Sequence, residues 1–107
     1  MIDVRFLPNP FYDPEMRTLT GLDEKVSNFV IDHPKTQEFL GAWFRLLDAV
    51  MPGYIAEGKP RLSIAIGCTG GQHRSVAIAE ATGRYLERHQ YHVSISHRDL
   101  AKANLRS

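Results

Sequence analysis

A glycine-rich segment in the second half of the chain carries residue types suited to binding an anion. Residues 67–76 read Gly-Cys-Thr-Gly-Gly-Gln-His-Arg-Ser-Val. Glycines let successive backbone amides point into one concavity, and a helix that starts here adds unpaired amides with a partial positive charge. His73 and Arg74 fall in the first turn of that helix, where cations oppose the helix dipole unless an anion is bound. The segment therefore predicts a phosphate or carboxylate site rather than a plain turn with a surface arginine.

The same segment also fits a catalytic motif. Residues 68–75 match C-x-x-G-x-x-R-S, the signature of cysteine-dependent phosphatases, in which the cysteine attacks phosphorus and the arginine holds the phosphoryl oxygens. The position before the cysteine lacks the histidine usual in those enzymes, and the chain is short for their fold. Asp13 and Asp99 are the candidate general acids. A phosphatase using Cys68, Arg74 and Asp99 is thus the alternative to a non-catalytic binding domain; otherwise the cysteine is a small buried apolar residue.

A second catalytic string occurs near the end of the chain. His97-Arg98-Asp99-Leu100, with Asn104 five residues after Asp99, reproduces the catalytic-loop string of protein kinases. The chain has none of the other kinase motifs, including the glycine-rich nucleotide loop and the strand lysine. We therefore interpret this string as a strand end that leads into a short terminal segment.

Length and composition indicate one ordinary globular domain over residues 1–107. A hydrophobic content of 43% supports a packed core, and a net charge of +1 excludes a strongly basic nucleic-acid binder. The single cysteine cannot form an internal disulfide, and no apolar run approaches the roughly 20 residues of a membrane helix. No signal peptide is recognisable, so a cytoplasmic location is expected. No metal or cofactor is predicted.

Apolar spacing predicts the elements that position the anion-binding segment. The expected strands are 2–7, 62–66 and 92–96. The first expected helix is capped by Asp23 and stopped by Pro34, and the second begins at Thr36 and ends or kinks at Pro52-Gly53. The third expected helix is 73–90. Strand 62–66, helix 73–90 and strand 92–96 have the length of a βαβ crossover, which gives parallel strands. We therefore expect an α/β fold with a small, mostly parallel sheet flanked by helices.

Ligands of open parallel sheets lie beyond the carboxyl ends of the strands. The loop that follows strand 2–7 reaches the same edge if that strand is also parallel, which brings in Asn9. Hydroxyls, glycine amides and two cations would then surround the anion. The predicted ligand-binding residues are Asn9, Thr69, Gly70, Gly71, His73, Arg74 and Ser75.

Nearly the whole chain resembles a known family, the C-terminal domain of RapZ, the RNase adapter protein. The matching segments are Asp3–Pro10, Thr20–Asp23, Ala65–Val76 and His97-Arg98, in the family's order. The resemblance implies a sheet similar to a phosphofructokinase subdomain, no known phosphatase chemistry, and binding of a hexosamine phosphate such as glucosamine-6-phosphate. It also implies homo-oligomers and binding of a small RNA that is presented to an endoribonuclease, which controls amino-sugar synthesis. By motif, the ligand contacts would be Thr69, Gly70, His73 and Arg74.

Three departures from the family affect these expectations. The chain contains no Walker-type G-x-x-x-x-G-K-[ST], so the N-terminal nucleotide-binding half is missing. Phe11 stands where some members carry a histidine that contributes to the anion pocket. The lysine- and arginine-rich tail of enteric members is reduced, so Arg98, Lys102 and Arg106 are the candidate RNA-binding residues, and they predict weak, salt-sensitive binding.

Overall fold

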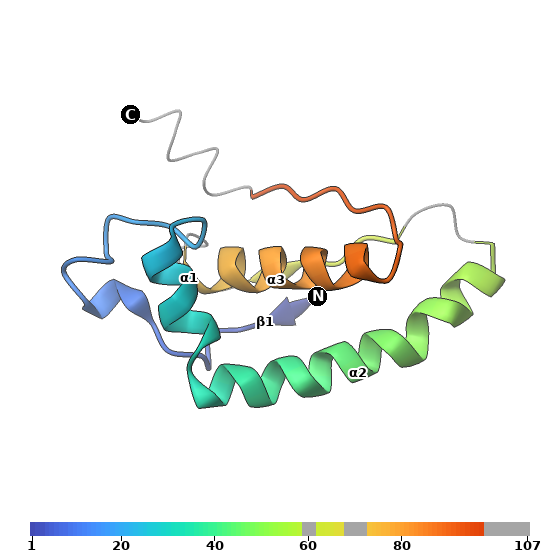
Figure 1. The fold of residues 1–107 in the computed structure, drawn as a ribbon, viewed down its shortest axis with the longest axis horizontal. Helices are drawn as coiled ribbons and strands as arrows, with labels where there is room; N and C mark the ends of the chain where they lie inside the picture. Colours follow the sequence, from blue (N-terminus) through green and yellow to red (C-terminus); the bar gives the residue numbers. More distant parts are fainter. Residues whose placement is uncertain (59–61, 68–72, 98–107) are drawn as a thin grey trace.

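Two short parallel strands, three α-helices and one 3-10 helix form the part of the fold that the structure describes (Figure 1). The computed structural model describes residues 1–58, 62–67 and 73–97. The elements in chain order are β1 (Ile2–Asp3), the 3-10 helix η1 (Pro10–Tyr12), α1 (Glu24–Ile31), α2 (Pro34–Ala56), β2 (Ile66–Gly67) and α3 (Arg74–Arg88). α3 lies centrally and contacts α1 and β2. The expected α/β class, with a small parallel sheet flanked by helices, is confirmed.

The sheet joins the beginning of the chain to the segment that precedes the glycine-rich loop. Ile2 pairs with Ile66 and Asp3 with Gly67. The backbone N–H of Ile2 donates to Ala65 O (2.8 Å), and that of Val4 donates to Gly67 O (2.7 Å). Both strands therefore end at one edge, as a parallel pairing requires.

The helices begin and end close to the predicted positions. Asp23 occupies the N-cap of α1, but its carboxylate accepts from the backbone N–H of Thr20 (2.7 Å) instead of capping the helix. Pro34 begins α2, where its missing N–H costs no helical hydrogen bond. α2 then continues through Pro52 to Ala56. Within the part of the chain that the structure covers, no helix is both long and apolar enough to cross a membrane.

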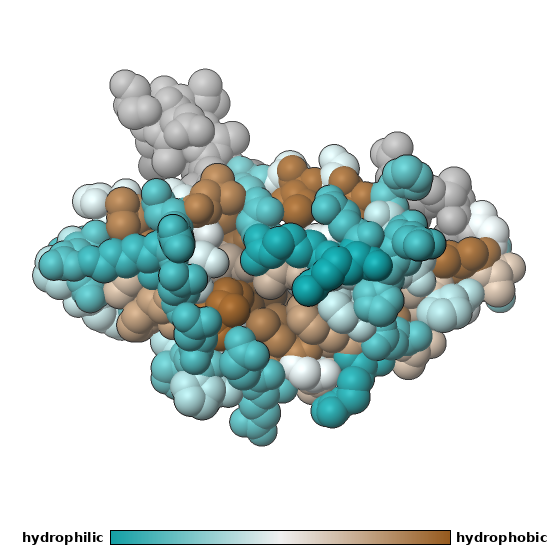
Figure 2. Space-filling view, in the orientation of Figure 1, coloured by the Kyte–Doolittle hydropathy of each residue, from teal (hydrophilic) through white to brown (hydrophobic). Residues whose placement is uncertain are grey.

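The core lies between α3, α2 and α1. Side chains from all three helices and from the N-terminal segment form it: Val4, Leu7, Met16, Val26, Val30, Leu40, Trp43, Leu47, Ala77, Ile78 and Leu86. The indole N–H of Trp43 donates to Thr82 Oγ1 (3.1 Å), which ties α2 to α3 inside this core. On the face drawn in Figure 2, hydrophilic side chains are interspersed with apolar ones.

The strands are much shorter than the sequence predicts. The expected strand 2–7 ends at Asp3, because residues 5 and 6 form a turn in which Leu7 N–H donates to Val4 O (3.1 Å). The expected strand 62–66 is reduced to Ile66–Gly67, since β1 offers only two residues for pairing. Residues 92–96, predicted as a strand, are not assigned to a strand.

The segment 91–97 is held by side-chain packing on α3 instead of by a strand ladder. A Cβ built on Gly83 of α3 would lie 2.4 Å from Ile95 Cδ1 and 3.4 Å from Val93 Cγ1. Val93 and Ile95 thus face the helix and alternate as in a strand, but residues 91–97 are not assigned to a strand. The predicted βαβ crossover is therefore wrong in its last element, because residues 92–96 pack on α3 and are not assigned to a strand.

Candidate functional site

The Arg74 side chain is buried at the start of α3, with only 4% of its surface exposed. Its Nη1 donates to two backbone carbonyl oxygens of the segment after β1, those of Arg5 (2.5 Å) and Leu7 (3.3 Å). No carboxylate of the described residues forms an ion pair with it. A buried charge without a counter-ion is costly. An anion bound beside Arg74 would remove that cost.

Two buried nitrogens at this position have no hydrogen-bond partner among the described residues. They are Nε of Arg74 and Nε2 of His73, the residue that precedes α3 and is 7% exposed. Because Nη1 of Arg74 is fixed by carbonyls, the Nε side of the guanidinium is the one that can bind an anion in bidentate fashion. Buried polar groups are nearly always hydrogen-bonded, so an unpartnered pair at a helix start indicates a ligand site.

The carboxylate at the neighbouring strand end, Asp3, is paired with Arg5. The pKa of the Asp3 carboxyl is lowered from its ordinary value, first by the hydrogen bond from the backbone N–H of Arg5. The Arg5 guanidinium, 2.8 Å from Asp3 Oδ2, lowers it further, and the charge of Arg74 adds a smaller contribution. Asp3 thus forms its ion pair with Arg5 and none with Arg74.

The other predicted site residues divide into two groups. Asn9 and Ser75 are described: Asn9 Oδ1 accepts from Phe11 N–H (3.0 Å) at the start of η1, and Ser75 is buried in the first turn of α3. Asp13, a candidate general acid, accepts from Glu15 N–H (2.8 Å). The remaining predicted residues lie outside the described residues: Cys68, Thr69, Gly70, Gly71, Arg98, Asp99, Lys102 and Arg106.

A glycine that the sequence marks only as a turn supports the start of α3. A Cβ on Gly21 would lie 2.5 Å from His73 O and 2.6 Å from Ala77 N. These two atoms belong to the first hydrogen bond of α3, in which Ala77 N–H donates to His73 O (3.0 Å). The loop before α1 therefore lies directly against the backbone that carries His73 and Arg74.

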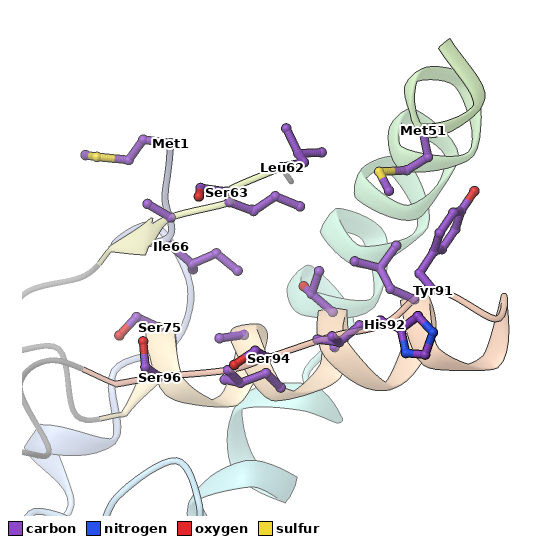
Figure 3. Close-up of a pocket in the computed structure, with 18 of the residues that line it drawn as sticks. Met1, Met51, Leu62, Ser63, Ile66, Ser75, Tyr91, His92, Ser94 and Ser96 are labelled. Atoms are coloured by element: carbon purple, nitrogen blue, oxygen red, sulfur yellow. The ribbon is translucent and has the colours of Figure 1, made fainter. Parts of the chain in front are cut away.

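A cleft of about 1050 Å³ lies between residues 62–67 and 91–97 and above α3 (Figure 3). Ser75 and Ser96 lie next to each other at the end where β2 stops, and Tyr91 and Met51 lie at the opposite end. His97 also lines this cleft. Its Nε2 lies 3.0 Å from Oε1 of Glu80, a pair that sequence spacing could not reveal because 17 residues separate them.

Among the described residues, no group of three or more histidine, cysteine, aspartate or glutamate side chains is placed to hold a metal ion. The donors that the structure assembles are cationic or neutral instead. They suit an anionic ligand with hydrogen-bonding groups. The arrangement defines a small α/β domain with buried basic side chains where a strand leads into a helix.

Comparison with known proteins gives the family. Residues 1–101 match the family described as the RapZ C-terminal domain, and the chain belongs to that family. It is 55% identical over 102 residues to a "Nucleotide-binding protein" of Lactiplantibacillus plantarum, and 56% identical over 102 residues to a protein of the same name from Syntrophomonas wolfei. Each match covers 95% of this chain but only 34% and 35% of the relative. The chain thus spans about a third of the length of these relatives.

Proposed function

We propose that this domain is a non-catalytic sensor that binds a phosphorylated amino sugar, similar to glucosamine-6-phosphate, at the junction of β2 and α3. The observation that carries the proposal is the buried Arg74, which has no ion-pair partner among the described carboxylates and whose Nε is unpartnered, as is Nε2 of the preceding His73. A phosphate group would satisfy both nitrogens and offset the buried charge. Thr69, Gly70, Gly71 and Ser75 add hydroxyl and amide donors, and Asn9 adds its side chain from the loop after β1.

The proposal is compatible with the names of the relatives, which describe nucleotide-binding proteins and no enzyme. The amino sugar itself comes from the family resemblance, as do homo-oligomers. The phosphatase alternative depends on Cys68 and Asp99, and no described contact favours it.

Titration calorimetry of the chain with glucosamine-6-phosphate tests the proposal. We expect glucosamine-6-phosphate to bind the chain saturably and glucosamine to show no binding at the same concentrations, because only the phosphate ester supplies the anion. The ester should be recovered unchanged after the titration, since it is bound and not cleaved. Equal responses to the two sugars, or release of inorganic phosphate that a Cys68→Ser variant abolishes, would contradict the proposal.

We further propose that the domain contributes to an RNase adapter that binds small regulatory RNA through Arg98, Lys102 and Arg106. Log affinity falls as log salt concentration rises, and removing three phosphate contacts makes this slope about 2 less steep for single-stranded RNA. The Arg98→Ala, Lys102→Ala, Arg106→Ala triple variant should show that change in gel-shift titrations at several salt concentrations. A variant with Lys35 and Arg45, both exposed on α2, changed to alanine is the control. An unchanged slope in the triple variant would refute the assignment.

A further inference from the structure

The cleft between residues 62–67 and 91–97 changes in character along its length. At the end next to the first turn of α3 it is lined by Gly67, Ser75, Ser96 and His97. At the other end it is lined by apolar and aromatic side chains, including Leu62 and Tyr91 (Figure 3). Ser75, which lies at this polar end, directly follows Arg74 in the first turn of α3.

His97 is fixed at the polar end of the cleft by a carboxylate. Its Nε2 lies 3.0 Å from Glu80 Oε1, and the two side chains are only 13% and 27% exposed. Glu80 belongs to α3, and His97 is the last residue of the segment 91–97 and lines the cleft. The pair therefore links this segment to α3. With Nε2 directed to Glu80, Nδ1 is the ring nitrogen that can contact a ligand.

We propose that the sugar ring of the phosphorylated ligand binds at this polar end and that His97, oriented by Glu80, recognises a ring hydroxyl. This inference rests on the proposed function, since it places the sugar of the same ligand. Sugar hydroxyls both donate and accept hydrogen bonds. The imidazole tautomer that donates from Nε2 to Glu80 offers Nδ1 as an acceptor, and the hydroxyl of Ser96 can take either role. Inorganic phosphate has no group that reaches the cleft. His97 is therefore a determinant of sugar selectivity, and Glu80 is a positioning residue.

The test compares glucosamine-6-phosphate with inorganic phosphate by titration calorimetry. The wild-type chain should bind the sugar phosphate more tightly than phosphate. His97→Ala should weaken sugar-phosphate binding by about tenfold, the usual effect of losing one hydrogen bond in a partly buried site, while the affinity for phosphate stays within about twofold. His97→Gln, whose side-chain amide retains an acceptor, should recover part of the loss. His89→Ala, an exposed histidine that does not line the cleft, is the matched control and should change neither affinity.

Glu80→Gln distinguishes positioning from simple structural support. It should weaken sugar-phosphate binding less than His97→Ala does, and it should move the imidazole NMR signals of His97, which a remote structural change would leave in place. Thermal melting of each variant checks that the fold is retained.

The outcomes separate this inference from the proposed function. An equal loss for both ligands in His97→Ala, or no loss for either, overturns the inference and leaves the anion site intact. Equal affinity of the wild-type chain for the two ligands does the same. Failure of the wild-type chain to bind either ligand overturns both proposals.

Discussion

Replacing Arg74 by alanine is expected to weaken the binding of glucosamine-6-phosphate at least about tenfold. Hydrogen bonds to charged groups contribute about 1.5–3 kcal/mol each, and about 1.4 kcal/mol corresponds to a factor of ten in affinity. The variant loses both the charge and the Nε donor that has no partner among the described residues. Titration calorimetry measures the change directly.

Arg74 also holds the segment after β1, so stability must be measured alongside affinity. Without the side chain, the carbonyl oxygens of Arg5 and Leu7 lose their Nη1 donor. Arg74→Lys keeps the positive charge but cannot serve two carbonyls and a bidentate anion together, so we expect it to recover little affinity. Arg84→Ala, an exposed arginine on the same helix, is the matched control.

Thermal melting gives an independent readout of the same site. Ligand at 100 times its Kd stabilises a binding-competent protein by about 2.7 kcal/mol. The wild-type chain and Arg84→Ala should therefore melt at higher temperature when glucosamine-6-phosphate is present, and Arg74→Ala should not. An Arg74→Ala variant with wild-type affinity and a wild-type ligand-induced shift would refute the assignment of the anion site.

Gly21→Ala is expected to destabilise the fold by about 1–3 kcal/mol, the usual cost of forcing extra atoms into a packed site. The added Cβ would lie 2.5 Å from His73 O and 2.6 Å from Ala77 N, and these are backbone atoms that cannot turn aside. For a domain of this size the cost corresponds to a fall in Tm of about 4–8 °C per kcal/mol. The first turn of α3 must shift, so sugar-phosphate binding should weaken as well.

Gly41→Ala is the matched control for this effect. A Cβ on Gly41, an exposed position within α2, would meet nothing within 4 Å. Alanine in place of a helical glycine should stabilise α2 by about 0.5–1 kcal/mol. The same substitution is thus expected to act in opposite directions at the two positions. A Gly21→Ala variant that melts at or above the wild-type temperature would contradict the close packing of the loop against α3.

The sequence by itself determined the helices and the order of the elements. The apolar spacing and Pro34 placed α1, α2 and α3 close to their observed bounds, because helix formation depends on contacts within a few residues. The position of His73 and Arg74 at the start of α3 followed from the same local pattern. The family resemblance over most of the chain is confirmed by the family match.

Only the tertiary structure decided the lengths of the strands and the surroundings of the basic residues. A strand needs a neighbour to pair with, so the alternation in 92–96 could not determine whether a ladder forms there. The burial of Arg74 against Arg5 and Leu7, and the pairing of His97 with Glu80, join residues 69, 67 and 17 positions apart. Such contacts are set by how helices and segments pack in space, and no local pattern in the chain encodes them.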